Sequence, residues 1–121
     1  MALALIVEDE AMLLVLAESV LQTAGYETFS ASSLAEATTI IESDTKLDIV
    51  FTDLALGDET DGGIEVGKLI GSARPGTPVL YTSGRELTDG LKLLFIENSA
   101  FLPKPYTDDQ LNAALAKLLT T

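Results

Sequence analysis

Five side chains suited to phosphate and metal chemistry stand directly after short apolar runs. Glu8 and Asp9 follow the run ALALIV, and Asp53 follows LDIVFT, while Ser83 and Lys104 follow two later runs. Three nearby carboxylates repel one another and raise each other's pKa, and a hard cation such as Mg²⁺ relieves that repulsion. A lysine beside them is a fixed positive charge for an incoming anion. Together these residue types predict a metal-assisted site for phosphoryl transfer.

Lys104 is the most restricted of these residues, because it stands between two prolines in the stretch FLPKPY. Proline before it removes one backbone donor, and proline after it favours an extended backbone at Lys104. The chain has only seven basic residues, so a lysine held this rigidly after an apolar run indicates a specific role.

Each of these residues taken alone also has an ordinary structural explanation. An acidic pair often begins a helix, an aspartate often sits in a turn, and a lysine is usually a solvated charge. The functional hypothesis therefore depends on their conjunction at the ends of separate apolar runs. The remaining acids of the stretch GDETDGG are interpreted as solvated loop charges: Asp58, Glu59 and Asp61.

Short apolar runs alternate with amphipathic segments along the whole chain. We expect strands at Ala2–Val7, Glu27–Ser30, Leu47–Thr52, Val79–Thr82 and Ala100–Leu102. We expect helices at Ala11–Thr23, after a Ser33–Glu36 capping box, at Ile64–Ala73, at Leu87–Asn98, and after a Thr107–Gln110 cap. The first helix should bury the stripe Leu13, Leu16, Ala17, Val20 and Leu21.

This alternation predicts an α/β fold in which a parallel sheet is covered by helices on both faces. The 121 residues, 47% of them hydrophobic, fit one domain spanning residues 1–121. Binding sites in such sheets form beyond the carboxyl ends of the strands. The chemically distinctive residues all follow apolar runs, so the fold would bring them together at one edge.

Composition excludes several classes of function. A net charge of −12 disfavours binding to nucleic acid or to anionic lipid, and no apolar run is long enough to span a membrane. The chain has no histidine and no cysteine, which excludes Ser-His triads, thiolate chemistry and the usual zinc sites. The lack of cysteine fits a reducing, cytoplasmic location.

The chain resembles the receiver domains of two-component response regulators over essentially its whole length. The resemblance rests on IVEDE, DIVFTDLAL, PVLYTSG and FLPKPY, and on spacings of 30 residues from Asp53 to Ser83 and 51 from Asp53 to Lys104. It implies the doubly wound, flavodoxin-like (CheY-like) arrangement, with strand order 2-1-3-4-5 and five helices.

The resemblance also implies roles for individual residues around a bound Mg²⁺. Asp53 would be the phosphoacceptor and, with Asp9, a direct metal ligand. Glu8 would act through metal-bound water, and the backbone carbonyl of Ala55 would be the third protein ligand.

Three further positions match the family's phosphoryl-binding and switch residues. Ser83 would hydrogen-bond the phosphoryl group and Lys104 would pair with it. Phe101 occupies the aromatic switch position, where it lacks the hydroxyl of a tyrosine. Gly57 departs from the family, because a proline is frequent there, and the following loop is about one residue longer.

The expected partner is a sensor histidine kinase or a histidine phosphotransfer protein, which would supply the histidine that this chain lacks. We expect no enzymatic turnover beyond the chain's own phosphorylation and dephosphorylation. With only this domain, the chain would be a stand-alone regulator or a piece of a larger protein such as a hybrid kinase.

Three alternative functions are less favoured. A haloacid-dehalogenase-like phosphatase needs an acid two residues after the nucleophile, where this chain has Ala55. A flavodoxin-like cofactor binder needs a first loop of Ser, Thr and Gly, whereas this loop is acidic. A degenerate receiver that acts only as a docking module is disfavoured by the complete set of acids, Ser83 and Lys104.

The run LKLLFI at residues 91–96 is unusually apolar for a helix on a sheet. We expect Leu91, Leu94 and Phe95 to face inward, leaving Leu93 and Ile96 outward. That would make the surface of the fourth helix, fifth strand and last helix a site for self-association or target docking. The alternative is a displaced or partly unwound helix that buries all five apolar residues.

Overall fold

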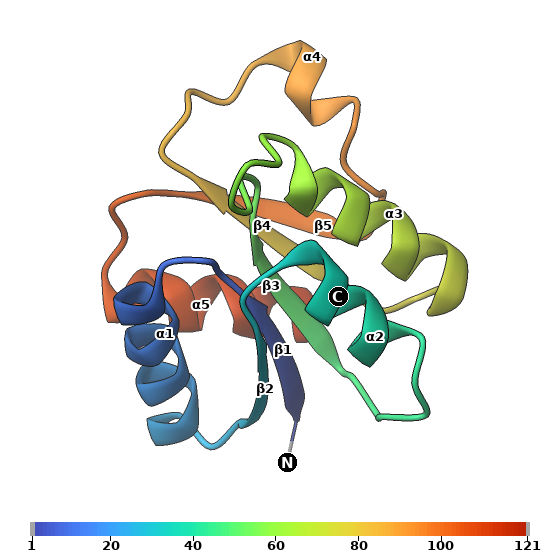
Figure 1. Cartoon of the computed structure of the whole chain (residues 1–121). Coiled ribbons are helices and arrows are strands. Elements are labelled where there is room, and N and C mark those ends of the chain that lie inside the picture. Colours follow the sequence, from blue (N-terminus) through green and yellow to red (C-terminus); the bar gives the residue numbers. More distant parts are fainter. Residues whose placement is uncertain (1, 121) are drawn as a thin grey trace.

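A parallel five-stranded sheet forms the centre of the protein (Figure 1). The computed structural model describes residues 2–120. The strand order β2-β1-β3-β4-β5 confirms the expected doubly wound topology. The strands are β1 (Leu3–Val7), β2 (Glu27–Ala31), β3 (Ile49–Asp53), β4 (Val79–Ser83) and β5 (Ser99–Pro103). The helices are α1 (Ala11–Thr23), α2 (Leu34–Ile41), α3 (Gly62–Ala73), α4 (Asp89–Lys92) and α5 (Asp108–Leu119).

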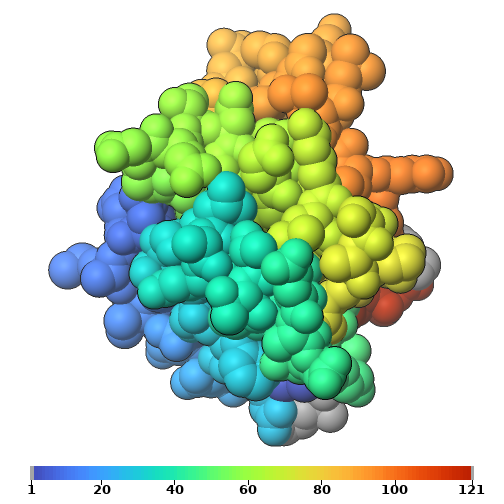
Figure 2. Space-filling view, turned by 45° about the vertical axis from the view of Figure 1, so that its right-hand side comes forward, coloured from blue at the N-terminus to red at the C-terminus, as the bar shows by residue number. Residues whose placement is uncertain are grey.

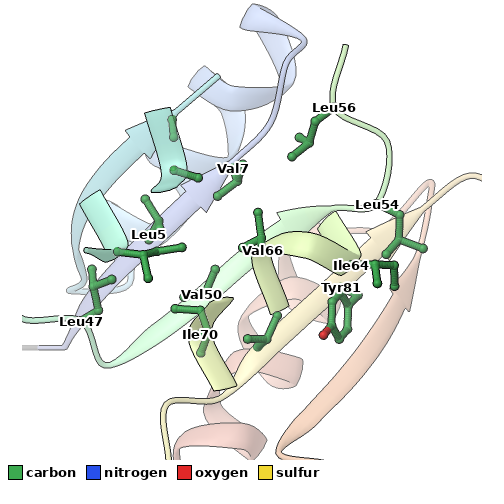
Figure 3. Packing of buried hydrophobic residues seen from close by; sticks show 14 residues of the cluster. Leu5, Val7, Leu47, Val50, Leu54, Leu56, Ile64, Val66, Ile70 and Tyr81 are labelled. Atoms are coloured by element: carbon green, nitrogen blue, oxygen red, sulfur yellow. The ribbon is translucent and has the colours of Figure 1, made fainter. Parts of the chain in front are cut away.

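Two hydrophobic clusters cover the two faces of the sheet. Leu5, Val50 and Tyr81 point into the cluster beneath α2 and α3 (Figure 3). Their neighbours Ile6 and Phe51 point to the opposite face, beneath α1 and α5. Successive residues of a strand alternate between faces, and both faces of β1, β3 and β4 are covered, so these strands are mostly apolar, whereas the edge strand β2 (ETFSA) is largely polar and partly exposed.

The strand register places the functional residues at one edge. Val7 pairs with Thr52 and Asp53 with Thr82, while Ser83 pairs with Pro103. Because all five strands are parallel, the residue that follows each strand emerges at the same edge. The sheet therefore brings the ends of β1, β3, β4 and β5 together.

The helix caps agree only in part with the sequence analysis. The capping box of Thr107 and Gln110 is present at α5. At α2, Ser33 Oγ accepts from the Glu36 N–H, but the Glu36 carboxylate accepts from the Ser32 N–H and hydroxyl instead of from Ser33. The second half of the predicted box was therefore wrong.

Other boundaries shift by one or two residues. The third strand begins at Ile49, and α3 begins at Gly62 instead of Ile64. On α1, Leu14 packs against the core, whereas Leu16 is 55% exposed, so Leu16 does not belong to the buried stripe. Within residues 2–120, no helix combines the length and hydrophobicity needed to cross a bilayer.

The fourth helix differs most from the prediction, because it is a single turn, Asp89–Lys92, instead of Leu87–Asn98. Beyond Lys92 the chain is anchored to Tyr81 of β4. The Ile96 N–H donates to the Tyr81 hydroxyl at 3.2 Å, and the Phe95 ring stacks on Tyr81 at 4.1 Å. These contacts take the place of continued helical hydrogen bonds.

The apolar residues after α4 are consequently oriented differently than expected. Leu91, Phe95 and Ile96 pack against the core, so the outward placement of Ile96 was wrong. Leu93 is 85% exposed and Leu94 is 44% exposed, so the inward placement of Leu94 was wrong as well. The helix is shortened, as in the alternative, but it does not bury all five apolar residues. This orange segment projects from the rest of the molecule in Figure 2.

Candidate functional site

Lys104 joins two of the carboxylates at the edge of the sheet. Its Nζ lies 2.6 Å from Asp53 Oδ2 and 3.2 Å from Glu8 Oε1. Both carboxylates are buried, and the lysine side chain is largely shielded from solvent. The hydrogen bonds between these charged groups offset the cost of removing them from water, and loss of one partner would leave an uncompensated buried charge.

The backbone around Lys104 is held from both sides. Its N–H donates to the Ser83 carbonyl at 3.0 Å, which extends the pairing of β4 and β5 by one residue. The following peptide bond, Lys104–Pro105, is cis. The sheet therefore fixes the backbone of Lys104, and the carboxylates of Asp53 and Glu8 hold its ammonium.

The three carboxylates of Glu8, Asp9 and Asp53 are arranged as a metal ion requires. Each offers one oxygen, and these oxygens lie within 4.8 Å of one another. Glu8 and Asp53 are buried, whereas Asp9 is exposed. A set of hard oxygen donors open to water on one side fits Mg²⁺, which retains several of its own waters.

Burial perturbs the ionisation of this cluster. Burial raises the pKa of Glu8 to about 7; the Glu10 N–H and Lys104 oppose the shift, and the charge of Asp53 adds to it. Burial alone would lower the pKa of Lys104, but its hydrogen bonds and attraction to Asp53 and Glu8 outweigh this and raise it. Without a metal, Glu8 is thus partly protonated near neutral pH, whereas Lys104 keeps its charge.

The pKa of Glu8 predicts how stability in EDTA depends on pH. Between 4.5, its ordinary value, and about 7, the folded protein holds a proton that the unfolded chain has released. The free energy of unfolding should therefore fall as pH rises through this window. Urea titrations from pH 5 to 8 measure it. Glu8→Gln should flatten the slope, and an unchanged slope would contradict this assignment.

The other predicted site residues lie close by. Ser83 is buried, and its Oγ accepts from the Arg85 N–H at 2.9 Å. The Ala55 N–H donates to Asp53 Oδ1 at 3.3 Å, while the metal-binding role of its carbonyl stays a prediction. Phe101 is half-buried, and its ring stacks against Phe95 with the centroids 6.1 Å apart.

Comparisons with known proteins agree with this geometry. The family model for the response regulator receiver domain matches residues 4–116. The chain belongs to this family. A receiver protein from Sinorhizobium medicae is 32% identical, with a TM-score of 0.90 over 99% of this chain and 95% of that one. A receiver domain from Clostridium thermocellum is 25% identical, with a TM-score of 0.85 over 99% and 95%.

Curated relatives extend the comparison to longer proteins. The alginate biosynthesis transcriptional regulatory protein AlgB of Pseudomonas syringae is 30% identical over 116 residues, which cover 95% of this chain. The chain spans about a quarter of the length of the curated relatives it matches. It is thus a phosphoacceptor receiver domain of two-component signalling.

Two contacts at this receiver's site were not predicted from the sequence. Arg85 bridges the loops after β4 and β3, because its Nη2 lies 3.0 Å from Asp61 Oδ1 and 3.3 Å from the Thr60 carbonyl. Asp61 is therefore not merely a solvated charge. The Gly57 N–H donates to Asp9 Oδ2 at 3.0 Å. Both contacts join residues distant in sequence, so no local pattern signals them.

A groove beside the site was also not predicted. It has a volume of about 500 Å³ and lies between α1 and the β5–α5 loop. Leu13 and Leu16 of α1 line it, as do Lys104, Pro105 and Tyr106 of the β5–α5 loop.

Proposed function

We propose that Asp53 of this receiver accepts a phosphoryl group from a phosphohistidine on a sensor kinase or phosphotransfer protein. The observation that carries the proposal is the contact of 2.6 Å between Lys104 Nζ and Asp53 Oδ2. A partly buried positive charge beside the carboxylate supports the proposal, because it would offset the charge that develops on a phosphoryl oxygen. Apart from this self-modification, we propose no enzymatic turnover.

In the transfer, an Asp53 carboxylate oxygen attacks phosphorus, and the bond from phosphorus to the histidine nitrogen breaks. The histidine leaves with the bonding electrons and takes up a proton, while Asp53 becomes an acyl phosphate. The Lys104 ammonium now contacts the Asp53 carboxylate, and a small movement would let it contact a phosphoryl oxygen instead. A donor that needs no reorganisation during reaction stabilises the transition state most effectively.

Glu8, Asp9 and Asp53 would hold Mg²⁺, with Asp9 and Asp53 as direct ligands and Glu8 acting through water. The Ala55 carbonyl completes the proposed protein ligands. When bound, the metal supplies positive charge that offsets the charge developing on the phosphoryl oxygens. The cluster of oxygens within 4.8 Å supports this assignment.

Signal output would begin at Ser83, whose hydroxyl now accepts from the Arg85 N–H. A phosphoryl group on Asp53 would offer an acceptor for the proton of that hydroxyl, and a turn of Ser83 toward it would alter the hydrogen bond that holds the loop carrying Arg85. Phe101 and the stacked Phe95 link this edge to the α4 segment. The proposed switch is thus a rearrangement of the segment around α4 and β5.

The groove along α1 fits the partner that delivers the phosphoryl group. Its walls are largely apolar, and Leu16 of α1, which lines it, is 55% exposed. Lys104 lines the groove and contacts Asp53, so a partner helix bound there would lie near the phosphoacceptor. We also propose a cytoplasmic location for this receiver, because the kinase that phosphorylates it would use ATP inside the cell.

Phosphorylation of the wild-type protein tests this function directly. Acetyl phosphate with Mg²⁺ should add one phosphoryl group, read by intact-mass spectrometry, and EDTA should prevent the reaction. A docking-only receiver would remain unlabelled in both conditions, and that result would overturn the proposal.

Mg²⁺ should also stabilise the folded state, because only that state assembles the three carboxylates. We expect a gain of about 1–3 kcal/mol in the free energy of unfolding at 10–100 times the dissociation constant. Thermal melts in millimolar Mg²⁺ and in EDTA measure this gain. Asp9→Ala should abolish most of it, whereas an equal gain in that variant would contradict the carboxylate site.

The exposed leucines of the α4 segment mark a second proposed surface, formed with β5 and α5. Leu93→Glu with Leu94→Glu should leave folding unchanged, because both side chains lie outside the core. The double variant should lose self-association or target binding in sedimentation and pull-down measurements. Ala35→Glu with Thr39→Glu, at two exposed positions of α2, is the matched control, and unchanged association in the Leu93 and Leu94 variant would refute this surface.

A further inference from the structure

Gly57 connects the loop after β3 to the exposed member of the acidic cluster. Its N–H donates to Asp9 Oδ2 at 3.0 Å, across 48 residues of sequence. Among residues 2–120, this is the single hydrogen bond that the Asp9 side chain makes. One carboxylate oxygen is therefore held by the loop, and the other is left for a ligand.

Asp9 needs such a contact more than the other two acids do. Glu8 and Asp53 are buried and pair with Lys104, whereas Asp9 is exposed and has no ion-pair partner in residues 2–120. Repulsion from the two buried carboxylates and side-chain entropy both favour its turning away into water. A hydrogen bond from an N–H to a carboxylate counteracts this, because bonds to charged acceptors are stronger than neutral ones.

The loop is folded so that it presents this N–H. Leu56 and Glu59 exchange two backbone hydrogen bonds, of 2.9 and 3.0 Å, around Gly57 and Asp58. Gly57 turns the chain with a φ of +61°, which glycine adopts without strain. The turn is anchored by Leu56, which is buried and extends from the loop toward the core in Figure 3.

Close packing fixes the other side of this turn. A Cβ on Gly62 would lie 2.9 Å from Leu56 Cβ, so the start of α3 rests directly against that anchor. Arg85 holds Asp61 and the Thr60 carbonyl from the loop after β4. The turn is thus tied to the core and to its neighbouring loop, so the Gly57 amide is a fixed donor.

We propose that the Gly57 N–H is a positioning group for the metal ligand Asp9, holding its carboxylate toward Glu8 and Asp53 before Mg²⁺ arrives. The inference rests on the proposed metal-dependent function of this site. A proline at position 57 would have no N–H and could not adopt a φ of +61°. Glycine at this position therefore supplies both the turn and the donor.

Two proteins made by chemical ligation test the N–H donor of residue 57 separately from its positive φ. D-Alanine at position 57 retains the N–H and favours positive φ, whereas D-proline fixes φ near +65° and removes the N–H. We expect the D-alanine protein to bind Mg²⁺ about as tightly as wild type, and the D-proline protein about tenfold more weakly. Calorimetric titration with MgCl₂ measures both affinities.

Phosphorylation gives an independent readout of positioning. The Mg²⁺ concentration for half-maximal labelling by acetyl phosphate should rise about tenfold in the D-proline protein. The labelling rate at saturating Mg²⁺ should match that of the D-alanine protein, because the phosphoacceptor itself is unchanged. A general structural defect would lower that rate as well.

The possible failures are distinguishable. Equal Mg²⁺ affinity in the two proteins overturns the role of Gly57 and leaves the metal site intact, whereas a wild type that binds no Mg²⁺ overturns both. If the D-proline chain does not fold, amide hydrogen exchange provides a second test of the hydrogen bond from Gly57 to Asp9. In metal-free Asp9→Ala, the Gly57 amide should exchange faster while the Glu59 amide is unchanged, and equal protection of Gly57 overturns the inference.

Discussion

Asp53→Asn should reduce labelling by acetyl phosphate to background, a loss of about a hundredfold or more. Asparagine retains the shape of the side chain, but its neutral amide is a poor nucleophile and cannot form the acyl phosphate. The substitution also removes the charge that holds Lys104 at 2.6 Å. Intact-mass spectrometry over a time course, with Mg²⁺ saturating, measures the loss.

A matched variant separates chemistry from charge. Asp58→Asn makes the same change in net charge, at an exposed residue of the loop after β3, and should be labelled like wild type. Ser83→Ala should slow labelling without abolishing it, because Ser83 would contact the phosphoryl group but not accept it. If Asp53→Asn were labelled as fast as Asp58→Asn, the phosphoacceptor would lie elsewhere.

The central strands β1, β3 and β4 were predictable because they are buried on both faces. A strand such as β1 must then be apolar throughout, so it is recognisable in the sequence as a continuous apolar run. Parallel pairing brings the ends of these runs to one edge, so the convergence of Glu8, Asp53 and Lys104 followed from the topology. The distances between them depend on side-chain packing, which the sequence does not display.

The α4 segment was not predictable, because its conformation is decided by a residue outside it. The run LKLLFI has enough apolar residues for a helix, and nothing local stops that helix at Lys92. The termination comes from Tyr81, which binds the Ile96 N–H from 15 residues away. The Gly57–Asp9 contact escaped prediction for the same reason, since only the folded loop brings that amide to the carboxylate.

Gly67→Ala should destabilise the protein by about 2–4 kcal/mol, although alanine favours helix more than glycine does. Gly67 lies on the buried face of α3, directly against the Tyr81 ring. An added Cβ would overlap the Tyr81 hydroxyl and lie 2.9 Å from its Cζ. Tyr81 is fully buried and lies beside Ile64 of the same helix (Figure 3). Urea denaturation measures the loss.

Two further variants identify the cause of this loss. Gly71 lies one turn later on α3, where an added Cβ would make an ordinary contact of 3.4 Å with Ile96. Gly71→Ala should therefore leave the free energy of unfolding unchanged or raise it. Tyr81→Phe removes the overlapping oxygen and should recover part of the loss when combined with Gly67→Ala. Additive effects in that double variant would contradict the proposed overlap. Because the same hydroxyl accepts from the Ile96 N–H, a displaced Tyr81 should also release the α4 segment, seen as faster exchange of the Ile96 amide.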